Sequence, residues 1–367
     1  MNVPVKGNEK ITQLLNEWYI EIHARRIGQA HRLKEEIDKK IDNIEKDQTL
    51  LLYYSLLDFR FQYIVDNLGV SANSFDKVEE FEIPTNNFLT YYYHFFKAIH
   101  ASGIGNYMIA KEHFDKAESL LELVPDEIEK AEFYYKLGAF HYDIYESLNS
   151  VKYTSKAKEI FEQHESYERN IGFCENLIGT ACTKLREWAL SEEHLIKAMD
   201  IFSKLGEEKY VLMVRHNLGY MYSSQNLSPL AIRYLSEVTT HNPRHHKALF
   251  LQAREHYKLD ELNVAKDLAD KGYSICVELG NVEYRHLFSI LKCLISNVSS
   301  DELEKIALEG ISYFKGESLY EYVEESQEYL AVKFYEESNH AKSSEYFYLA
   351  SRTRQKIKER ESLKWKK

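Results

Sequence analysis

The chain has 367 residues, and acidic side chains outnumber basic ones by 58 to 47, which gives a net charge of −11. This balance argues against a nucleic-acid-binding protein that depends on phosphate neutralisation. Glycine and proline are scarce, at 14 and 5 residues, so turn-rich β folds are disfavoured and an all-α fold is predicted. Four cysteines are too few for a disulfide scaffold, and no signal peptide or membrane-spanning stretch is visible, so we expect a cytoplasmic protein.

Three helical patterns occupy residues 1–68. Apolar residues at i, i+3 and i+4 spacing run from Ile11 to Ile22 and again from Leu33 to Ile44. The third pattern starts near Asp47 and is apolar on nearly every face. Such a helix must be covered on more than one side. It is either the central helix of a bundle or a helix that leaves one side for a partner protein, and the sequence leaves both interpretations open.

The helical pattern stops after Leu68. Residues 69–90 contain two turn-rich stretches, with an acidic piece from Val78 to Glu82 between them that is predicted as a short helix. We therefore predict a three-helix bundle at 1–68 that binds the target, a linker at 69–90 and a repeat domain at 91–367 that binds a peptide.

The remainder of the chain repeats itself. Leu-Gly or Ile-Gly pairs place Gly138, Gly179 and Gly219 at intervals of 41 and 40 residues. Small and bulky residues around them fit the tetratricopeptide (TPR) pattern, in which small residues let two helices of a pair approach closely. Further units are predicted around Ala98, Ala101, Ala110, Phe114 and Ala117, around Ala253, Ala265 and Ala269, and around Ala331, Phe334, Ser343, Phe347 and Ala350, with a degenerate unit from Ser289 to Phe314. Stacked pairs of this kind form a right-handed superhelical array with a concave face suited to an extended peptide.

Few residues offer chemistry of their own. The sequence has no Gly-rich phosphate loop, HExxH or CxxC motif, so neither a cofactor nor a metal site is expected. Cys174 and Cys182 are interpreted as packing residues, and His245–His246 as part of a loop. The basic run at 352–358 is interpreted as a solvated terminal helix.

Two polar residues are predicted to lie in the peptide groove. Asn217 precedes Gly219 by two residues, on the first helix of its pair, where an amide can pair with the backbone of an extended peptide. Asp200, in the preceding unit, can take a positive side chain or an amino terminus. For each, an ordinary surface or inter-helix hydrogen bond is the alternative.

A three-helix bundle, a linker and a TPR array of this length together resemble the Rap family of Bacillus response-regulator aspartate phosphatases. The resemblance covers almost the whole chain. It is carried by the segments Leu15–Tyr19, Asp47–Gln48 with Leu52–Arg60, and Lys130–Lys136. The family implies a phosphorylated response regulator or a transcription factor as partner and a short re-imported signalling peptide, of the Phr type, as inhibitor.

The resemblance gives Gln48 a catalytic role. In family members that are phosphatases, a glutamine at this position enters the active site of the response regulator. There the regulator supplies Mg²⁺, and an amide need only orient a water molecule. The alternative to a catalytic role is a solvent-facing residue in the first turn of the helix.

Two rival functions follow from the same features. The chain can be a non-catalytic adaptor that sequesters its partner. DNA binding by the N-terminal bundle is the third option, but the third helix offers only Arg60 as a basic residue, so no direct contact with nucleic acid is expected. The link from Val238 to Pro243 is shorter than in many relatives, so no peptide contact beyond it is predicted.

Overall fold

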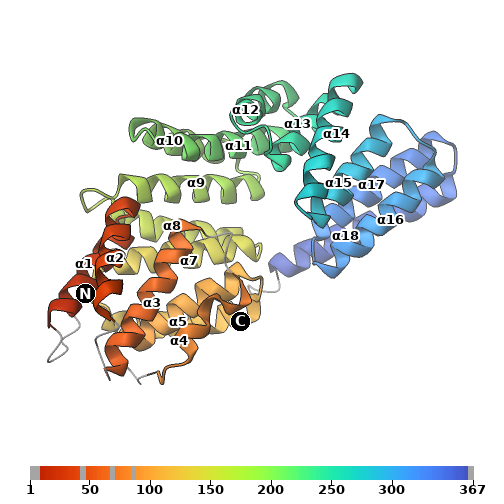
Figure 1. The fold of residues 1–367 in the computed structure, drawn as a ribbon. Coiled ribbons are helices and arrows are strands. Elements are labelled where there is room, and N and C mark those ends of the chain that lie inside the picture. The colour runs from red at the N-terminus through yellow and green to blue at the C-terminus, as the bar shows by residue number, and fades with distance from the viewer. Residues whose placement is uncertain (1–8, 42–46, 67–70, 84–87, 363–367) are drawn as a thin grey trace. The chain divides into compact units, whose positions relative to one another are not determined.

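The computed structural model describes residues 9–41, 47–66, 71–83 and 88–362. These residues form eighteen α-helices and two short 3₁₀ helices and contain no strand, which confirms the predicted all-α fold (Figure 1). The chain divides into two compact units, residues 1–185 and 186–367. The predicted linker at 69–90 lies inside the first unit, and the assignment of separate functions to residues 1–68 and 91–367 stays a prediction.

The first unit consists of nine of these helices with two 3₁₀ turns between them. They are α1 (Glu9–His23), α2 (Ile27–Ile41), α3 (Gln48–Val65), η1 (Ala72–Phe75), α4 (Asp76–Glu79), α5 (Phe88–Gly103), α6 (Tyr107–Ser119), η2 (Leu121–Leu123), α7 (Glu127–Asp143), α8 (Ser147–Phe161) and α9 (Glu168–Lys184). From α5 onward the long helices pack as successive pairs, α5 with α6 and α7 with α8.

The apolar third helix is covered on more than one side. α3 packs against α1 and α2 within the bundle and against α5 of the first repeat pair. Its side chains Leu50, Leu52, Tyr53, Leu56 and Leu57 are all buried. In this structure α3 is therefore the central helix, which confirms the first of the two interpretations of its sequence.

Part of the predicted linker packs against the helices on either side of it. The short helix begins at Asp76, two residues before the predicted start. Phe75 and Val78 are buried, and the Phe75 ring lies 4.9 Å from that of Phe59 on α3 and 5.5 Å from that of His100 on α5. These aromatic contacts tie the segment to both helices.

The turn between α1 and α2 has the geometry of a turn inside a repeat pair. Arg25 has a φ of 54°, and Tyr145, between α7 and α8, has a φ of 63°. In both turns this residue donates its backbone N–H to the carbonyl three residues earlier, and the next residue donates to the carbonyl five residues earlier. This Schellman-like closure makes α1 and α2 a hairpin of the repeat type, which the sequence pattern did not reveal.

Small residues bring the helices of each pair together, as predicted. A Cβ atom on Gly138 of α7 would lie 2.3 Å from Oγ1 of Thr154 and 3.1 Å from its backbone nitrogen on α8. A Cβ atom on Gly219 would lie 2.6 Å from Cγ of Leu235. Larger side chains at either position would force the two helices apart.

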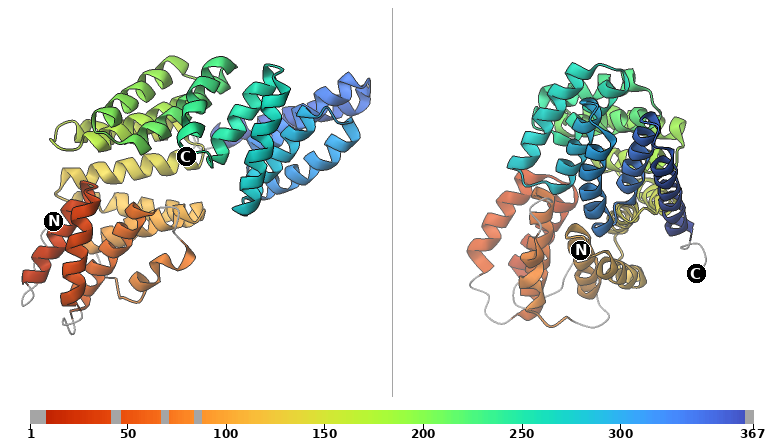
Figure 2. Two further views of the ribbon diagram at one scale, coloured as in Figure 1. Left: turned by 45° about the horizontal axis from the view of Figure 1, so that its top comes forward. Right: turned by 90° about the vertical axis from the view of Figure 1, so that its right-hand side faces the viewer.

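The second unit contains the remaining helices. They are α10 (Trp188–Lys204), α11 (Glu208–Ser224), α12 (Ser228–His241), α13 (His246–Lys258), α14 (Leu262–Glu278), α15 (Val282–Ile295), α16 (Ser300–Gly316), α17 (Tyr320–Glu336) and α18 (His340–Ser362). Figure 2 draws these helices, in green to blue, from two further sides. α13 contacts α11 and α15, the first helices of the neighbouring pairs, whereas the second helices of successive pairs contact one another less. The closer row is the inner side of a curved stack, so α11, α13, α15 and α17 form what we call the inner row.

Three details of the predicted repeats differ in the structure. The stretch predicted as a degenerate unit is a complete pair, because α15 begins at Val282 and α16 ends at Gly316. Phe347 was expected to pack inside the last pair but is 47% exposed, and Tyr346 takes that place, stacked 5.8 Å from Phe334. The helix turns the neighbouring position inward, a shift of one residue that spacing alone did not resolve. The link after Val238 is also shorter than expected, because α12 continues to His241.

Candidate functional site

Gln48 is the first residue of α3, and its side chain is exposed. Asp47 fixes the start of the helix, since its side chain accepts a hydrogen bond from the backbone N–H of Leu50 at 3.2 Å. Leu50 is completely buried one turn further on. The Gln48 amide is therefore presented to solvent from a helix end that capping and packing hold in place.

Side-chain bonds also hold α3 against α2. Nζ of Lys34 lies 2.9 Å from Oδ1 of Asp58, and the Tyr54 hydroxyl donates to Asp38 at 2.6 Å. Burial and the bond to Asp38 raise the pKa of Tyr54 to about 12, so the hydroxyl keeps its proton. This network sets the orientation of α3 and hence of Gln48.

A buried ion pair joins the bundle to the repeat array. Arg60 of α3 pairs with Glu132 of α7, and both side chains are about 2% exposed. Arg25, in the turn between α1 and α2, lies 3.9 Å from the same carboxylate. Its guanidinium also covers the ring of Phe173 on α9 at 4.7 Å, and its carbonyl accepts a hydrogen bond from Arg169 at 3.1 Å.

A second buried pair lies beside the first. Nε2 of His23 on α1 is 2.9 Å from Oε2 of Glu129 on α7, and Tyr91 donates to the other oxygen at 3.4 Å. Burial, helped by the charge of Arg60, lowers the pKa of His23 well below 6.5. Burial raises the pKa of Glu129 well above 4.5. Burial therefore favours the uncharged form of both groups, a carboxyl group that keeps its proton beside a neutral imidazole.

These contacts define the docked bundle: α1 to α3 seated on α5, α7 and α9 within the first unit. Breaking a buried ion pair by removing one partner is costly, whereas the intact pair adds little net stability, because desolvation offsets its attraction. The buried charges therefore chiefly determine the register in which the bundle docks, and add little to the stability of docking.

Asn217 lies half-buried on α11, in the inner row of the second unit. It precedes Tyr220 by one helical turn, so both side chains share one face of the helix. Burial and the negative charges of Glu321 and Glu325 on α17 raise the pKa of Tyr220. That face is therefore directed across the inner side of the stack, and the place of Asn217 in the peptide site stays a prediction.

Arg254 links the helices of the inner row. It donates to Ser223 of α11 at 2.9 Å and to Glu325 of α17 at 3.1 Å, and Tyr329 donates to the same carboxylate at 2.7 Å. Burial disfavours the charge of Arg254, but the charge of Glu325 outweighs it and raises the pKa. The result is a polar, aromatic strip with both donors and acceptors, which can pair with the backbone of an extended peptide.

The other residues singled out in the sequence have simple positions. Asp200 is exposed on α10, and its place in the peptide site stays a prediction. Cys174 and Cys182 are buried thiols on α9, as expected of packing residues. His245 caps α13 by accepting from the N–H of Ala248 at 3.1 Å, and the basic run at 352–358 lies in α18.

The described residues offer neither a metal site nor a helix that spans a membrane. In the part of the chain that the structure describes, no group of three or more His, Cys, Asp or Glu side chains could hold a metal ion. Within the same ranges, no helix is long and apolar enough to cross a membrane.

Comparison with known proteins shows a consistent similarity to one group of regulators. Residues 5–66 match the family model for the N-terminal part of response regulator aspartate phosphatase H. Among curated proteins, the chain is similar to regulatory protein RapF of Bacillus subtilis, with 28% identity over 96% of both chains. It is also similar to response regulator aspartate phosphatase I of the same organism, with 29% identity over 96% of this chain and 92% of the relative. The chain is therefore similar to Rap-family proteins along almost its whole length.

Solved structures agree with this similarity. A Rap protein complexed with competence and sporulation factor has a TM-score of 0.84 at 26% identity, over 96% of this chain and 99% of the other. Aspartyl phosphate phosphatase F from Bacillus subtilis has a TM-score of 0.68 at 28% identity, over 96% of each chain. The likeness spans the whole length of these Rap proteins, so the bundle and the array are both family features.

The sequence reasoning did not find the buried charges between the bundle and α7. Glu129 and Glu132 are buried on α7, three residues apart and thus on one face, beside the buried Ala131 and Phe133. Arg60 stands alone among apolar residues of α3. Isolated charges on opposite apolar helices are the signal that could have indicated a buried pair.

Proposed function

We propose that this protein binds a phosphorylated bacterial response regulator and stimulates hydrolysis of its aspartyl phosphate. The observation that carries the proposal is the exposed amide of Gln48 at the fixed start of α3, inside the segment that the family model matches. Relatives named as response regulator aspartate phosphatases support it.

Hydrolysis of an aspartyl phosphate requires few chemical groups from this protein. An aspartyl phosphate is an activated acyl phosphate, and the response regulator brings its own Mg²⁺. The Gln48 amide oxygen accepts a hydrogen bond from the attacking water and orients it in line with the bond that breaks. An amide does not titrate near neutral pH, so the protein contributes position rather than a base.

We propose further that a short peptide on the inner row switches the protein off by favouring the docked bundle. A ligand shifts such an equilibrium only by binding one form more tightly than the other. In the docked bundle, α5 covers one side of α3, while Gln48 itself stays exposed. Inhibition should therefore weaken binding of the response regulator and leave the chemical step of bound regulator unchanged.

A variant of Gln48 tests the proposal. The protein is incubated with a panel of phosphorylated response regulators, and phosphate loss is followed. Gln48→Ala should abolish stimulated hydrolysis but leave regulator binding nearly intact, because the amide adds little contact area. Thr49→Ala, the exposed neighbour in the same turn, is the matched control and should behave as wild type. Wild-type turnover by Gln48→Ala would reduce Gln48 to a helix-start residue.

A non-catalytic adaptor is the second candidate. It is favoured by the similarity to regulatory protein RapF, whose name carries no phosphatase activity. An adaptor would bind a response regulator or transcription factor through the bundle and leave any phosphate in place. The same panel decides between them, since binding without phosphate loss from any regulator supports the adaptor.

A further inference from the structure

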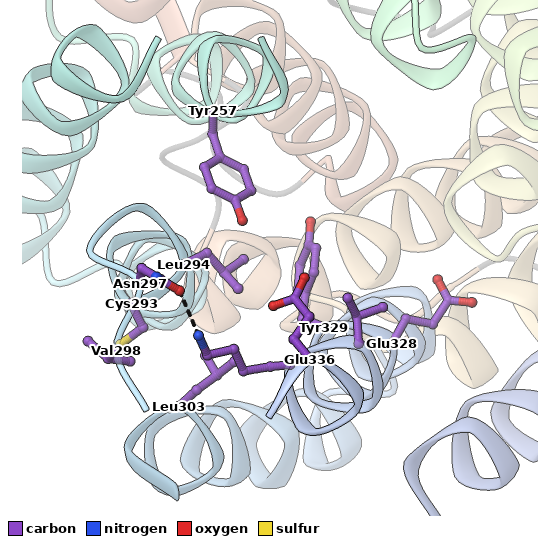
Figure 3. Close-up of a pocket in the computed structure, with 11 residues that line it drawn as sticks. Tyr257, Cys293, Leu294, Asn297, Val298, Leu303, Glu328, Tyr329 and Glu336 are labelled. Atoms are coloured by element: carbon purple, nitrogen blue, oxygen red, sulfur yellow. Dashed lines mark hydrogen bonds between the residues drawn. The ribbon is translucent and has the colours of Figure 1, made fainter. Parts of the chain in front are cut away.

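A pocket of about 360 Å³ lies within the second unit, between α13, α15, α16 and α17 (Figure 3). Tyr257 of α13 faces it from one side, and Tyr329 and Glu336 of α17 face it from the other. Leu294 and Val332 supply apolar surface. The volume is in the range of small-ligand sites, which combine apolar walls with a few convergent polar groups.

The pocket carries an uncompensated negative charge. Glu336 forms no ion pair or hydrogen bond with any residue that the structure describes, whereas Glu328, at the edge, is paired with Arg354. Lys333 is the pocket's own cation, and its Nζ lies 3.6 Å from Oε1 of Glu337 and donates to Oδ1 of Asn297 at 2.6 Å. That leaves Glu336 without a counter-charge.

The helix ends around the pocket reinforce this sign. Tyr257, Leu294 and Glu336 all lie in the last turns of their helices, α13, α15 and α17, and the carboxyl end of a helix is the negative end of its dipole. α16 points its positive end here, but Glu337 accepts hydrogen bonds from the backbone and side chain of Ser300 and neutralises that end.

Other ligand classes fit less well. An anion would meet Glu336 and three helix carboxyl ends. A neutral apolar group would leave the half-buried Tyr257 hydroxyl, which has no partner among the described residues, without one, although the exposed Glu336 would keep its water. A cation can face Glu336 and also lie against the rings of Tyr257 and Tyr329, because aromatic faces attract positive charge.

We propose that this pocket binds a primary ammonium or guanidinium group carried on an apolar stem, with Glu336 as its counter-charge and Tyr257 and Tyr329 as its walls. The site goes beyond the proposed function and needs no phosphatase activity. Only its natural source is linked to that function. The cation comes either from a basic side chain of the peptide on the inner row or from a free small diamine, and the two share this chemistry.

Calorimetric titration of the full chain with small probes tests the site. Acetyl-arginine amide should bind, and acetyl-citrulline amide, its neutral isostere, should bind about fivefold more weakly or not at all. Glu336→Gln should weaken the binding of acetyl-arginine amide about three- to fivefold, which is the range expected of an exposed charge pair. Glu345→Gln, which makes the same change at an exposed position of α18 outside the pocket, is the control and should not alter binding. Tyr257→Leu, which removes the aromatic ring, should also weaken the binding of acetyl-arginine amide.

The outcomes separate the pocket from the phosphatase proposal. Equal binding of the arginine and citrulline probes, or equal affinity of Glu336→Gln and Glu345→Gln, would overturn the site whatever the phosphatase assay gives. Glu336-dependent binding supports it even if no response regulator is dephosphorylated. Putrescine distinguishes the sources: tighter binding of acetyl-arginine amide assigns the cation to a peptide side chain, and tighter binding of putrescine assigns it to a free diamine.

Discussion

Replacing Glu132 with glutamine should release the docked bundle. The carboxylate is about 2% exposed and pairs with Arg60, which is equally buried on the other side of the interface. Glutamine has nearly the same shape, so packing on α7 is kept and only the charge is lost. The uncompensated Arg60 is then buried in the docked form but can return to water when the bundle separates.

The size of the shift follows from the burial of both partners. Removing one member of a fully buried ion pair costs roughly 3–5 kcal/mol. The glutamine oxygen still accepts a hydrogen bond from Arg60, which restores about 1 kcal/mol. Docking should therefore weaken by about 2–4 kcal/mol, or roughly 30- to 1,000-fold in its equilibrium constant. An exposed pair such as Lys111–Asp115 would contribute less than about 1 kcal/mol, so Asp115→Asn is the control.

Hydrogen exchange of the full chain measures the effect directly. In Glu132→Gln, amides of α3 and α7 should lose protection, while those of α13 to α17 should not. In the phosphatase assay, the variant should need more peptide for the same inhibition. The double change Arg60→Met with Glu132→Leu should restore protection, since an apolar pair of similar volume can replace a buried ion pair without loss. Unchanged protection of α3 in Glu132→Gln would refute the role of this pair in docking.

Three further outcomes are expected. Asn217→Ala should weaken the inhibitory peptide by about 1–3 kcal/mol in calorimetric titration, because a backbone group of the bound peptide loses its partner, and should leave uninhibited activity unchanged. The docked pair of His23 and Glu129 holds one proton, whereas the free groups have pKa values near 6.5 and 4.5. Docking, measured as the protection of α1 and α7 amides in hydrogen exchange, should therefore be strongest at about pH 5.5 and should weaken on either side. In Glu129→Gln only the depressed histidine pKa remains, so docking should instead rise with pH through about 6.5 and then level off. Gly138→Ala should lower the free energy of unfolding by about 1–3 kcal/mol in urea titration, whereas Gly28→Ala, where an added Cβ meets nothing within 4 Å, should be neutral or slightly stabilising.

Periodicity and small residues were sufficient to predict the repeat array. The glycine spacing places Gly138 and Gly219 where two helices cross, and the structure has them in close contact with the facing helix. The one-residue error at Phe347 has a physical origin. Tyr346 and Phe347 are both large and aromatic, and on a two-helix edge either can face inward, so sequence spacing does not decide between them.

The candidate site was harder to predict, because its parts are distant in the chain. Gln48 came from the family resemblance, since nothing in the pattern distinguishes it from any first-turn residue. The pairing of Arg60 with Glu132 joins residues 72 positions apart, and no local spacing indicates it. The pocket around Glu336 depends on three helix ends that converge only in the folded stack.

The composition of the docked interface bears on how the protein can switch. Burial of apolar residues of α3 and α5 stabilises the docked bundle. Because the hydrophobic effect is not directional, these residues alone would not select one register of docking. Arg60 meets Glu132, and His23 meets Glu129, only when α1 and α3 contact α7 in one register, and the net contribution of these pairs to docking is small. An interface built in this way can be specific without being permanent. A peptide whose differential affinity is a few kcal/mol could then move most molecules from one form to the other, since about 5.5 kcal/mol suffices to invert a hundredfold preference. Because Gln48 stays exposed throughout, such a switch acts on access to the response regulator and not on the amide that orients the water.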